Sequence, residues 1–228
     1  MNNQPLAEIK NLEKSYTEGE DKRLVLENAD MDIFKGDITL LLGKSGSGKS
    51  TLLNLLSGID RPDKGEINIL GKDISKFSEK ELTDFRRKNI GIVFQFFNLI
   101  PTLNVEENLN LVLKLNNIKN TGQTDWYLNE TGLSDRKKTY PDRLSGGEQQ
   151  RVSIARALIH EPEIILADEP TGNLDEKSGS KIIALFEKLV RQKNKTLVMV
   201  THNRDLIKIA DKVYSIKNRK FALEKGEP

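Results

Sequence analysis

The residues that most clearly point to chemistry are the eight from Gly43 to Ser50, which read Gly-Lys-Ser-Gly-Ser-Gly-Lys-Ser. They follow an apolar run, residues 38–42, and precede a second apolar stretch that begins at Thr51. This order predicts a strand, a glycine-rich loop and a helix, the setting in which the pattern G-x-x-x-x-G-K-[ST] binds phosphate groups. Glycines let backbone N–H groups approach an anion closely, and the helix start directs its own N–H groups and dipole at the same anion.

Each position of this phosphate-binding loop (P-loop) has an expected task. Lys49 would place a full positive charge near the β/γ bridge of a nucleoside triphosphate, and the Ser50 hydroxyl would ligate Mg²⁺. A chance glycine turn is the alternative, and the flanking strand and helix make it the weaker interpretation. The predicted nucleotide contacts here are Gly43, Lys44, Ser45, Gly46, Ser47, Gly48, Lys49, Ser50 and Thr51.

Two further apolar runs end in chemically active side chains. Residues 164–167 lead into Asp168 and Glu169, and residues 196–200 lead into a threonine and then His202. Continuous apolar runs are typical of parallel strands that are covered on both faces. Ligands bind beyond the carboxyl ends of such strands. If these strands neighbour the one before the P-loop, all these groups converge on one nucleotide.

The residue types suit hydrolysis of a triphosphate. Asp168 would hold Mg²⁺ directly or through water, and Glu169 would polarise the attacking water, while Pro170 biases Glu169 away from helical backbone angles. His202 would hydrogen-bond the γ-phosphate and that water. Taken alone, the two carboxylates could be a solvated acidic turn and His202 a capping residue. The other histidine, His160, is interpreted as structural, near a helix end where the dipole favours it.

Composition limits the remaining choices. The chain has 228 residues, 36% hydrophobic and 31% charged, with a net charge of +2 and no cysteine. This suits a globular chain of one large domain or two small ones. It argues against a disulfide framework and offers no basic stripe for nucleic acid. No apolar run approaches the ~20 residues that span a bilayer, so any membrane role is expected to come through a partner.

The order of elements predicts one domain over residues 1–228. Strands over 6–9 and 25–34 form an antiparallel opening layer, separated by a polar loop at 17–22. The region from about 96 to 158 contains helix patterns and no strand pattern, so it is interpreted as a helical subdomain inserted into a core of about 1–95 and 159–228. The other predicted strands are 38–42, 66–70, 90–94, 164–167, 196–200 and 213–216. The main predicted helices are 78–88, one with apolar residues at 105, 109, 112, 113 and 115, and 124–130, 146–160, 176–192 and 204–210.

A second decisive segment runs from Leu144 to Arg151 and reads Leu-Ser-Gly-Gly-Glu-Gln-Gln-Arg. Ser145 at the N-cap and Glu148 at N3 make a capping box that opens a helix. The two glycines after the cap leave backbone N–H groups uncovered, so this helix start could receive a second phosphate group. On spacing alone, an ordinary well-capped helix explains the same residues.

With this segment, the sequence resembles the ATP-binding cassette (ABC) ATPases from about residue 6 to residue 222. Leu144–Arg151 matches the family's signature motif, and residues 172–175 match its D-loop. Gln95 matches the Q-loop glutamine, His202 the switch histidine, and Tyr16 the aromatic that stacks on adenine. The resemblance implies a P-loop NTPase (RecA-like) α/β core with a mainly parallel sheet, an antiparallel β layer at the N-terminus and an inserted α-helical subdomain.

The resemblance also implies a homodimer that forms head to tail on ATP binding. Each ATP would lie between the P-loop of one subunit and Ser145, Gly146 and Gly147 of the other. The implied cofactors are ATP and Mg²⁺. The implied catalytic residues are Glu169, His202 and Gln95, the metal ligands Ser50, Gln95 and Asp168, and the further nucleotide contacts Tyr16, Ser145, Gly146, Gly147, Glu148 and Asp175.

Three segments, residues 94–101, 102–109 and 168–175, look like those of ATPases from lipoprotein-releasing, macrolide-efflux and antimicrobial-peptide-resistance systems. The expected function is ATP hydrolysis that powers a separate integral membrane permease for export. The expected place is the cytoplasmic face of a bacterial inner or plasma membrane, as a peripheral protein without nucleic-acid partners. The apolar residues 96–100 either pack under the helical subdomain or form a groove wall that receives a short helix of the permease.

Three alternatives remain at this stage. Some relatives transmit force to a cell-envelope complex without moving a substrate, and the residues do not separate that task from export. Cassette proteins of DNA repair or translation usually carry two cassettes, a coiled-coil insertion or a basic surface, and none of these is visible here. A P-loop nucleotide kinase would leave the signature helix and Gln95 without a role.

Overall fold

The computed structural model describes residues 4–19, 21–44 and 46–226. These form two compact units: the first holds the residues up to Arg86 together with those from Thr196 onward, and the second runs from Arg87 to Lys195. Helix α2 (Glu79–Asn89) carries the chain from the first unit into the second. The predicted division into core and helical subdomain stays a prediction.

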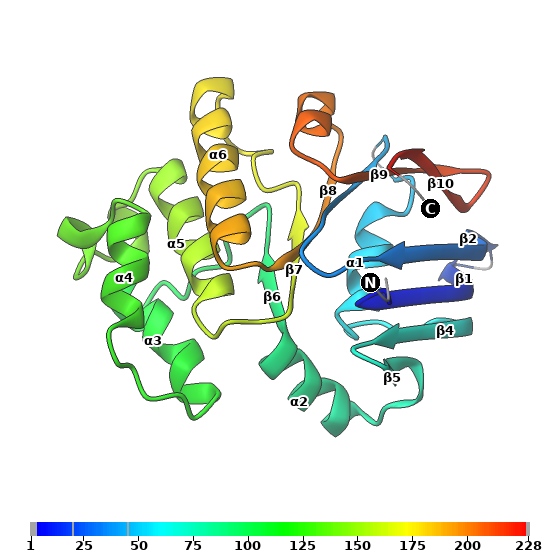
Figure 1. Ribbon diagram of the computed structural model, residues 1–228, viewed down its shortest axis with the longest axis horizontal. Coiled ribbons are helices and arrows are strands. Elements are labelled where there is room, and N and C mark those ends of the chain that lie inside the picture. The colour runs from blue at the N-terminus through cyan, green and yellow to red at the C-terminus, as the bar shows by residue number, and fades with distance from the viewer. Residues whose placement is uncertain (1–3, 20, 45, 227–228) are drawn as a thin grey trace. The chain divides into compact units, whose positions relative to one another are not determined.

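The first unit contains the expected antiparallel layer, in which β1 (Ala7–Glu18) lies between β2 (Asp21–Ile33) and β4 (Lys64–Ile69), with β5 (Lys72–Asp73) beyond β4 (Figure 1). Ala7 pairs with Ile33 on one side and with Ile69 on the other. The predicted loop at 17–22 is wrong, because β1 continues to Glu18 and β2 already begins at Asp21. Hydrogen bonds between strands join backbone groups and need no apolar side chains. The polar residues at the end of β1 and the start of β2 therefore still pair, up to Glu18 with Asp21.

The same unit contains the sheet that carries the P-loop. The buried strand β3 (Ile38–Leu42) lies between β8 (Thr196–Thr201) and β9 (Lys212–Lys217) and is parallel to both. Strand β10 (Lys220–Lys225) pairs antiparallel with β9. Leu42 pairs with Thr201, so β3 and β8 end at the same edge and present their following residues together.

Helix α1 (Lys49–Leu56) follows the P-loop as predicted. The helix predicted over 204–210 is wrong, because residues Arg204–Lys208 form the 3₁₀ turn η4. Asn203 accepts a hydrogen bond from the Asp205 amide, and this local capping closes a tight turn instead of starting a full helix. A second 3₁₀ turn, η1 (Ile74–Lys76), precedes α2.

The second unit pairs β6 (Ile90–Val93) in parallel with β7 (Ile164–Asp168). Its helices are α3 (Val105–Leu115), α4 (Gln123–Glu130), α5 (Gly146–Leu158) and α6 (Glu176–Gln192), with 3₁₀ turns η2 (Ser134–Arg136) and η3 (Pro141–Arg143). Figure 1 shows α5 beside α6, in yellow-green and yellow. As expected, residues 96–158 contain helices and turns without a strand.

In the described part of the chain, no helix has both the length and the apolar character needed to cross a membrane.

Candidate nucleotide-binding site

The P-loop joins β3 to α1 at the edge where β3 and β8 end. Gly46 and Gly48 have φ angles of 74° and 101°, in the left-handed region that glycine adopts without strain. A Cβ on Gly48 would lie 2.7 Å from Val25 Cγ1, so a side chain there would also clash. Ser45, one of the predicted contacts, lies outside the described residues.

Lys49 is 7% exposed, and its ammonium lies inside its own loop. Its Nζ donates to the carbonyls of Gly43, at 2.9 Å, and Lys44, at 3.0 Å. Helix α1 has Gly48 as its N-cap without a side-chain cap. A helix start of this kind has backbone N–H groups available for an anion. The loop therefore combines a charged donor with the backbone donors that phosphate groups need.

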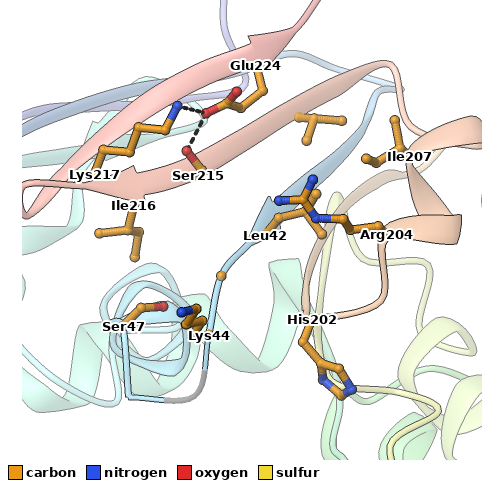
Figure 2. Close-up of a pocket in the computed structure, with 12 residues that line it drawn as sticks. Leu42, Lys44, Ser47, His202, Arg204, Ile207, Ser215, Ile216, Lys217 and Glu224 are labelled. Carbon is orange, nitrogen blue, oxygen red and sulfur yellow. Dashed lines mark hydrogen bonds and ion pairs between the residues drawn. The ribbon is translucent and has the colours of Figure 1, made fainter.

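A pocket of about 610 Å³ opens beside the loop, within the first unit. Figure 2 shows Lys44 and Ser47 of the P-loop on one side, with His202 and Arg204 across the pocket. The remaining lining residues are Leu42, Gly43, Ile207, Val213, Ser215, Ile216, Lys217 and Glu224. The structure thus brings His202 to the P-loop, as its position after β8 predicted.

The pocket has a positive lining. Lys44, Arg204 and Lys217 contribute three cations against the single carboxylate of Glu224. Lys217 pairs with that carboxylate at 2.5 Å and Ser215 donates to it at 2.6 Å, and these contacts lower the pKa of Glu224. A cleft with an excess of one charge attracts ligands of the opposite sign, so this pocket suits an anion.

Tyr16 has a fixed hydroxyl group. It donates to Asp60 at 2.8 Å and also hydrogen-bonds Thr51, which places Tyr16 beside the first turn of α1. The Lys14 ammonium lies 5.0 Å from the centre of the ring. Burial opposes ionisation of Asp60, but hydrogen bonds from Lys14 and Tyr16 outweigh it and lower the pKa of Asp60. The ring is therefore held near the P-loop helix by an ionised carboxylate.

In the second unit, Asp168 is the last residue of β7 and Glu169 follows it with a φ angle of 43°. Glu169 thus avoids the right-handed helical region that Pro170 disfavours, but it lies in the left-handed region and not in the extended region that a following proline favours. A non-glycine residue there is strained by about 1–3 kcal/mol, and such strain clusters at functional sites. The turn that follows is closed by a hydrogen bond from the Gly172 amide to the Glu169 carbonyl, at 2.9 Å.

Gln95 lies against this turn, within the second unit. The Asn173 side chain donates through Nδ2 to the backbone carbonyl of Gln95 at 2.8 Å. A Cβ on Gly172 would lie 2.9 Å from Gln95 Nε2, so a larger residue there would displace the end of the Gln95 side chain. Asp175, a predicted nucleotide contact, accepts a hydrogen bond from the Ser178 amide and is the N-cap of α6.

The capping box at the start of α5 is confirmed. The Glu148 carboxylate accepts from the Ser145 backbone amide and hydroxyl, both at 2.8 Å, and the Ser145 hydroxyl accepts from the Glu148 amide at 3.3 Å. These bonds and an ion pair with Arg136 lower the pKa of Glu148. Beyond the cap the two glycines differ. A Cβ on Gly147 would meet only Arg151 Nη1, at 3.9 Å, whereas a Cβ on Gly146 would lie 3.3 Å from Leu174 Cδ2.

The predicted site residues therefore fall into two groups. The first unit brings together the P-loop, Tyr16 and His202. The second unit brings Gln95 to the turn that follows Asp168 and Glu169, and it also holds Ser145. That both groups surround one nucleotide stays a prediction.

Two contacts near these residues could not be predicted from the sequence. Asp60 fixes Tyr16, and Arg156 of α5 donates to the carbonyls of Phe97 and Asn98, just after Gln95. No spacing rule links these positions, because each contact joins elements that meet only in the fold.

Comparison with known proteins decides the family. A family model described as ABC transporter matches residues 26–172, which is more than half of the chain. This protein belongs to the ABC transporter ATP-binding family. Accordingly, the predicted P-loop NTPase fold is confirmed, and the chain is the ATP-binding and ATP-hydrolysing subunit of an ABC transporter.

Named relatives agree with this assignment. An uncharacterised ABC transporter ATP-binding protein of Mycobacterium tuberculosis is 49% identical, over 95% of this chain and 89% of the relative. The bacitracin export ATP-binding protein BceA of Halalkalibacterium halodurans is 41% identical, over 97% and 90%. The lipoprotein-releasing system ATP-binding protein LolD of Wigglesworthia glossinidia brevipalpis is 41% identical, over 97% and 98%. The predicted resemblance to these exporter-type ATPases is confirmed.

The fold has solved counterparts. A dimeric structure of the ATP-binding cassette MJ0796, in a post-hydrolysis state bound to ADP and Pi, superposes with a TM-score of 0.88 and 38% identity. It covers 97% of this chain and 99% of that one. The ABC cassette is thus a nucleotide-binding fold that has been seen as a dimer.

Proposed function

We propose that this subunit binds ATP with Mg²⁺ and hydrolyses it in a head-to-tail homodimer, to power export by a separate integral membrane permease. The observation that carries the proposal is Lys49, whose ammonium is held by two carbonyls of the loop that would receive the phosphates. Names such as bacitracin export and lipoprotein-releasing system favour export over force transmission without a substrate. The permease would place this subunit at the cytoplasmic face of the membrane.

The proposed Mg²⁺ ligands fit the ion's chemistry. Mg²⁺ prefers hard oxygen ligands and usually keeps several waters beside substrate phosphates. Ser50 supplies a hydroxyl, Asp168 a carboxylate and Gln95 an amide carbonyl. When bound, the ion would neutralise charge on the β- and γ-phosphates.

The chain's own residues have distinct proposed roles. Lys49 and the P-loop amides hold the phosphates, and Tyr16 stacks on adenine. Glu169 accepts a proton from the attacking water, which His202 and Gln95 orient toward the γ-phosphate. Ser145, Gly146 and Gly147 of the partner subunit would contact the γ-phosphate from the other side, supported by Glu148 and Asp175. The room at Gly147, where a Cβ would meet nothing nearer than Arg151 Nη1 at 3.9 Å, supports this last role.

The test is Glu169→Gln, which keeps the side chain's size but removes the base. Positioned acid–base groups contribute about 10²–10⁴-fold in rate. We expect ATP binding to persist, hydrolysis to fall by at least that order, and a dimer to accumulate on Mg²⁺–ATP in size-exclusion chromatography. The control is Glu187→Gln, the same change at a half-buried glutamate of α6, and it should behave as the unmodified protein. Normal turnover in Glu169→Gln would remove Glu169 from the catalytic role.

A further inference from the structure

The loop that follows Gln95 holds an unusual backbone shape. Phe97 and Asn98 have φ angles of 60° and 49°, so two successive non-glycine residues occupy the left-handed region. Asparagine tolerates this region, but a bulky residue such as phenylalanine is a true outlier there. Strained backbone of this kind persists only where surrounding contacts hold it.

Arg156, in the last turn of α5, supplies those contacts. Its Nη1 donates to the Asn98 carbonyl at 2.6 Å and its Nη2 to the Phe97 carbonyl at 2.9 Å. Among the described residues no carboxylate forms an ion pair with this guanidinium, and burial lowers its pKa. Arg156 is half-buried, and taking a cation partly out of water is costly unless its hydrogen bonds are met, so the two loop carbonyls help to offset that cost.

Helix α5 is seated on β6 directly beside this contact. A Cβ on Gly91 would lie 2.1 Å from the carbonyl oxygen of Ala157, the neighbour of Arg156. The backbones of β6 and α5 therefore meet with no room for a side chain between them. This contact fixes the register of the helix on the strand, and the strand ends just before Gln95.

The other end of α5 contacts the same loop. A Cβ on Gly146 would lie 3.7 Å from the ring of Phe97. Phe97 thus faces the helix start with its ring and the last helical turn with its carbonyl. Because an α-helix moves as a rod, a displacement of the loop at Arg156 is carried to Ser145 at the capped end.

We propose that Arg156 is a positioning residue that locks the Gln95-bearing loop to the signature helix, so that a movement of Gln95 toward nucleotide is transmitted to Ser145. This inference rests on the proposed function. Arg156 lies outside the ATP-binding group of the first unit, so its loss should leave nucleotide affinity intact while it impairs the steps that need Gln95 and Ser145 in place.

The experiment compares Arg156→Gln and Arg156→Lys with Arg86→Gln. Arg86 is a matched control in the first unit, because its guanidinium also donates to two successive carbonyls, those of Ser57 at 3.1 Å and Gly58 at 2.9 Å. For each variant we would measure the Kd of ATP, the kcat, and ATP-driven dimerisation in the Glu169→Gln background.

A misplacement of about 1 Å can cost on the order of 10²-fold in rate. We therefore expect Arg156→Gln to bind ATP normally, to lose about that much kcat, and to need far more ATP to dimerise. Arg156→Lys should fall between, because lysine lacks the planar fork that reaches both carbonyls. Arg86→Gln should lose stability without losing kcat.

Two outcomes would overturn the inference. One is an Arg156→Gln protein with unchanged kcat and dimerisation. The other is a loss of ATP affinity that matches the loss of kcat, which indicates general unfolding. Should Arg156→Gln fail to fold, Arg156→Lys decides by the same two criteria. The proposed function itself fails if the unmodified protein does not hydrolyse ATP and the Glu169→Gln variant does not dimerise with ATP. That result differs from both outcomes above, because it does not depend on any change at Arg156.

Discussion

The chemistry of each P-loop residue depends on its neighbours in sequence. The glycines, Lys49 and Ser50 act through a local loop, and the structure places Lys49 on the carbonyls of that loop. Asp60 and Arg156 were not predictable, because each acts on a residue far along the chain. Local motifs therefore reveal the groups that touch phosphate, and tertiary contacts determine what holds them.

Tyr16 offers a test of base stacking with a matched control. Tyr16→Ala removes the ring, and stacking on an aromatic side chain is worth about 1–3 kcal/mol per base. We expect the Kd for ATP to rise by roughly 5- to 150-fold. Tyr16→Phe keeps the ring and loses only the hydrogen bond to Asp60, so its affinity should stay close to the original. Isothermal titration with ATP measures both, and equal affinities in all three proteins would remove Tyr16 from the adenine site.

Elements were predicted best where burial is continuous. The apolar runs of β3, β7 and β8 each gave a strand within one residue of its observed bounds. Strand β10 was not predicted, because no residue of Lys220–Lys225 is fully buried and the strand carries charged residues at both ends. This strand forms because it pairs with β9. Such pairing requires no alternation of apolar and polar residues, so the sequence does not reveal it.

Two glycine-to-alanine substitutions, one in the tight contact of α5 with β6 and one in α6, should change stability in opposite directions. Gly91→Ala places a Cβ 2.1 Å from the Ala157 carbonyl oxygen, and forced overpacking typically costs about 1–3 kcal/mol. Gly179→Ala in α6 meets only ordinary contacts with Thr171, at 3.4 Å or more, and alanine should stabilise this helix by up to ~1 kcal/mol. Urea unfolding of both variants measures the difference. Equal stabilities would contradict the tight seating of α5.

His160 connects the end of α5 to the start of β6 and gives a pH prediction. Its Nε2 lies 3.2 Å from the Ile90 carbonyl, and burial lowers its pKa. The expected benefit from the helix dipole depends on the charged form of the ring, and burial disfavours that form. Its structural role agrees with the sequence interpretation.

The lowered pKa of His160 determines the direction in which stability changes with pH. At a pH above about 6.5, the ordinary pKa of histidine in the unfolded chain, the ring is neutral in both states and does not reduce the stability of the fold. As the pH falls below that value, the unfolded chain binds the proton first and stability declines. His160→Gln keeps an N–H donor and should flatten the dependence of Tm on pH between about 6.5 and 5 relative to the unmodified protein. Parallel curves for the two proteins would show that His160 does not contribute.

At the scale of the whole molecule, the family, the fold class and the ATPase activity follow from two short segments and the order of apolar runs. The meeting of the two residue groups around one nucleotide does not follow from either unit by itself. A solved relative of this chain is described as a dimer with ADP and Pi, and the proposed head-to-tail dimer would bring the start of α5 to the nucleotide of the partner subunit.

The head-to-tail arrangement predicts rescue between two inactive proteins. Lys49→Ala disables the P-loop, and Ser145→Arg blocks the signature helix with a bulky cation. In a mixed dimer one site carries both defects, while the other combines an intact Lys49 with an intact Ser145. Random pairing of a symmetric dimer leaves about one quarter of all sites intact, so a 1:1 mixture should recover ATPase activity toward that fraction.

The control is each variant alone at the total concentration of the mixture, where every site carries one defect and activity should stay at background. The double variant Lys49→Ala/Ser145→Arg mixed with either single variant should also stay inactive, because no pairing then restores a complete site. If each site were instead built from one chain, every site in the first mixture would keep a defect. An inactive 1:1 mixture, with dimers demonstrated by size-exclusion chromatography, would therefore refute the shared site.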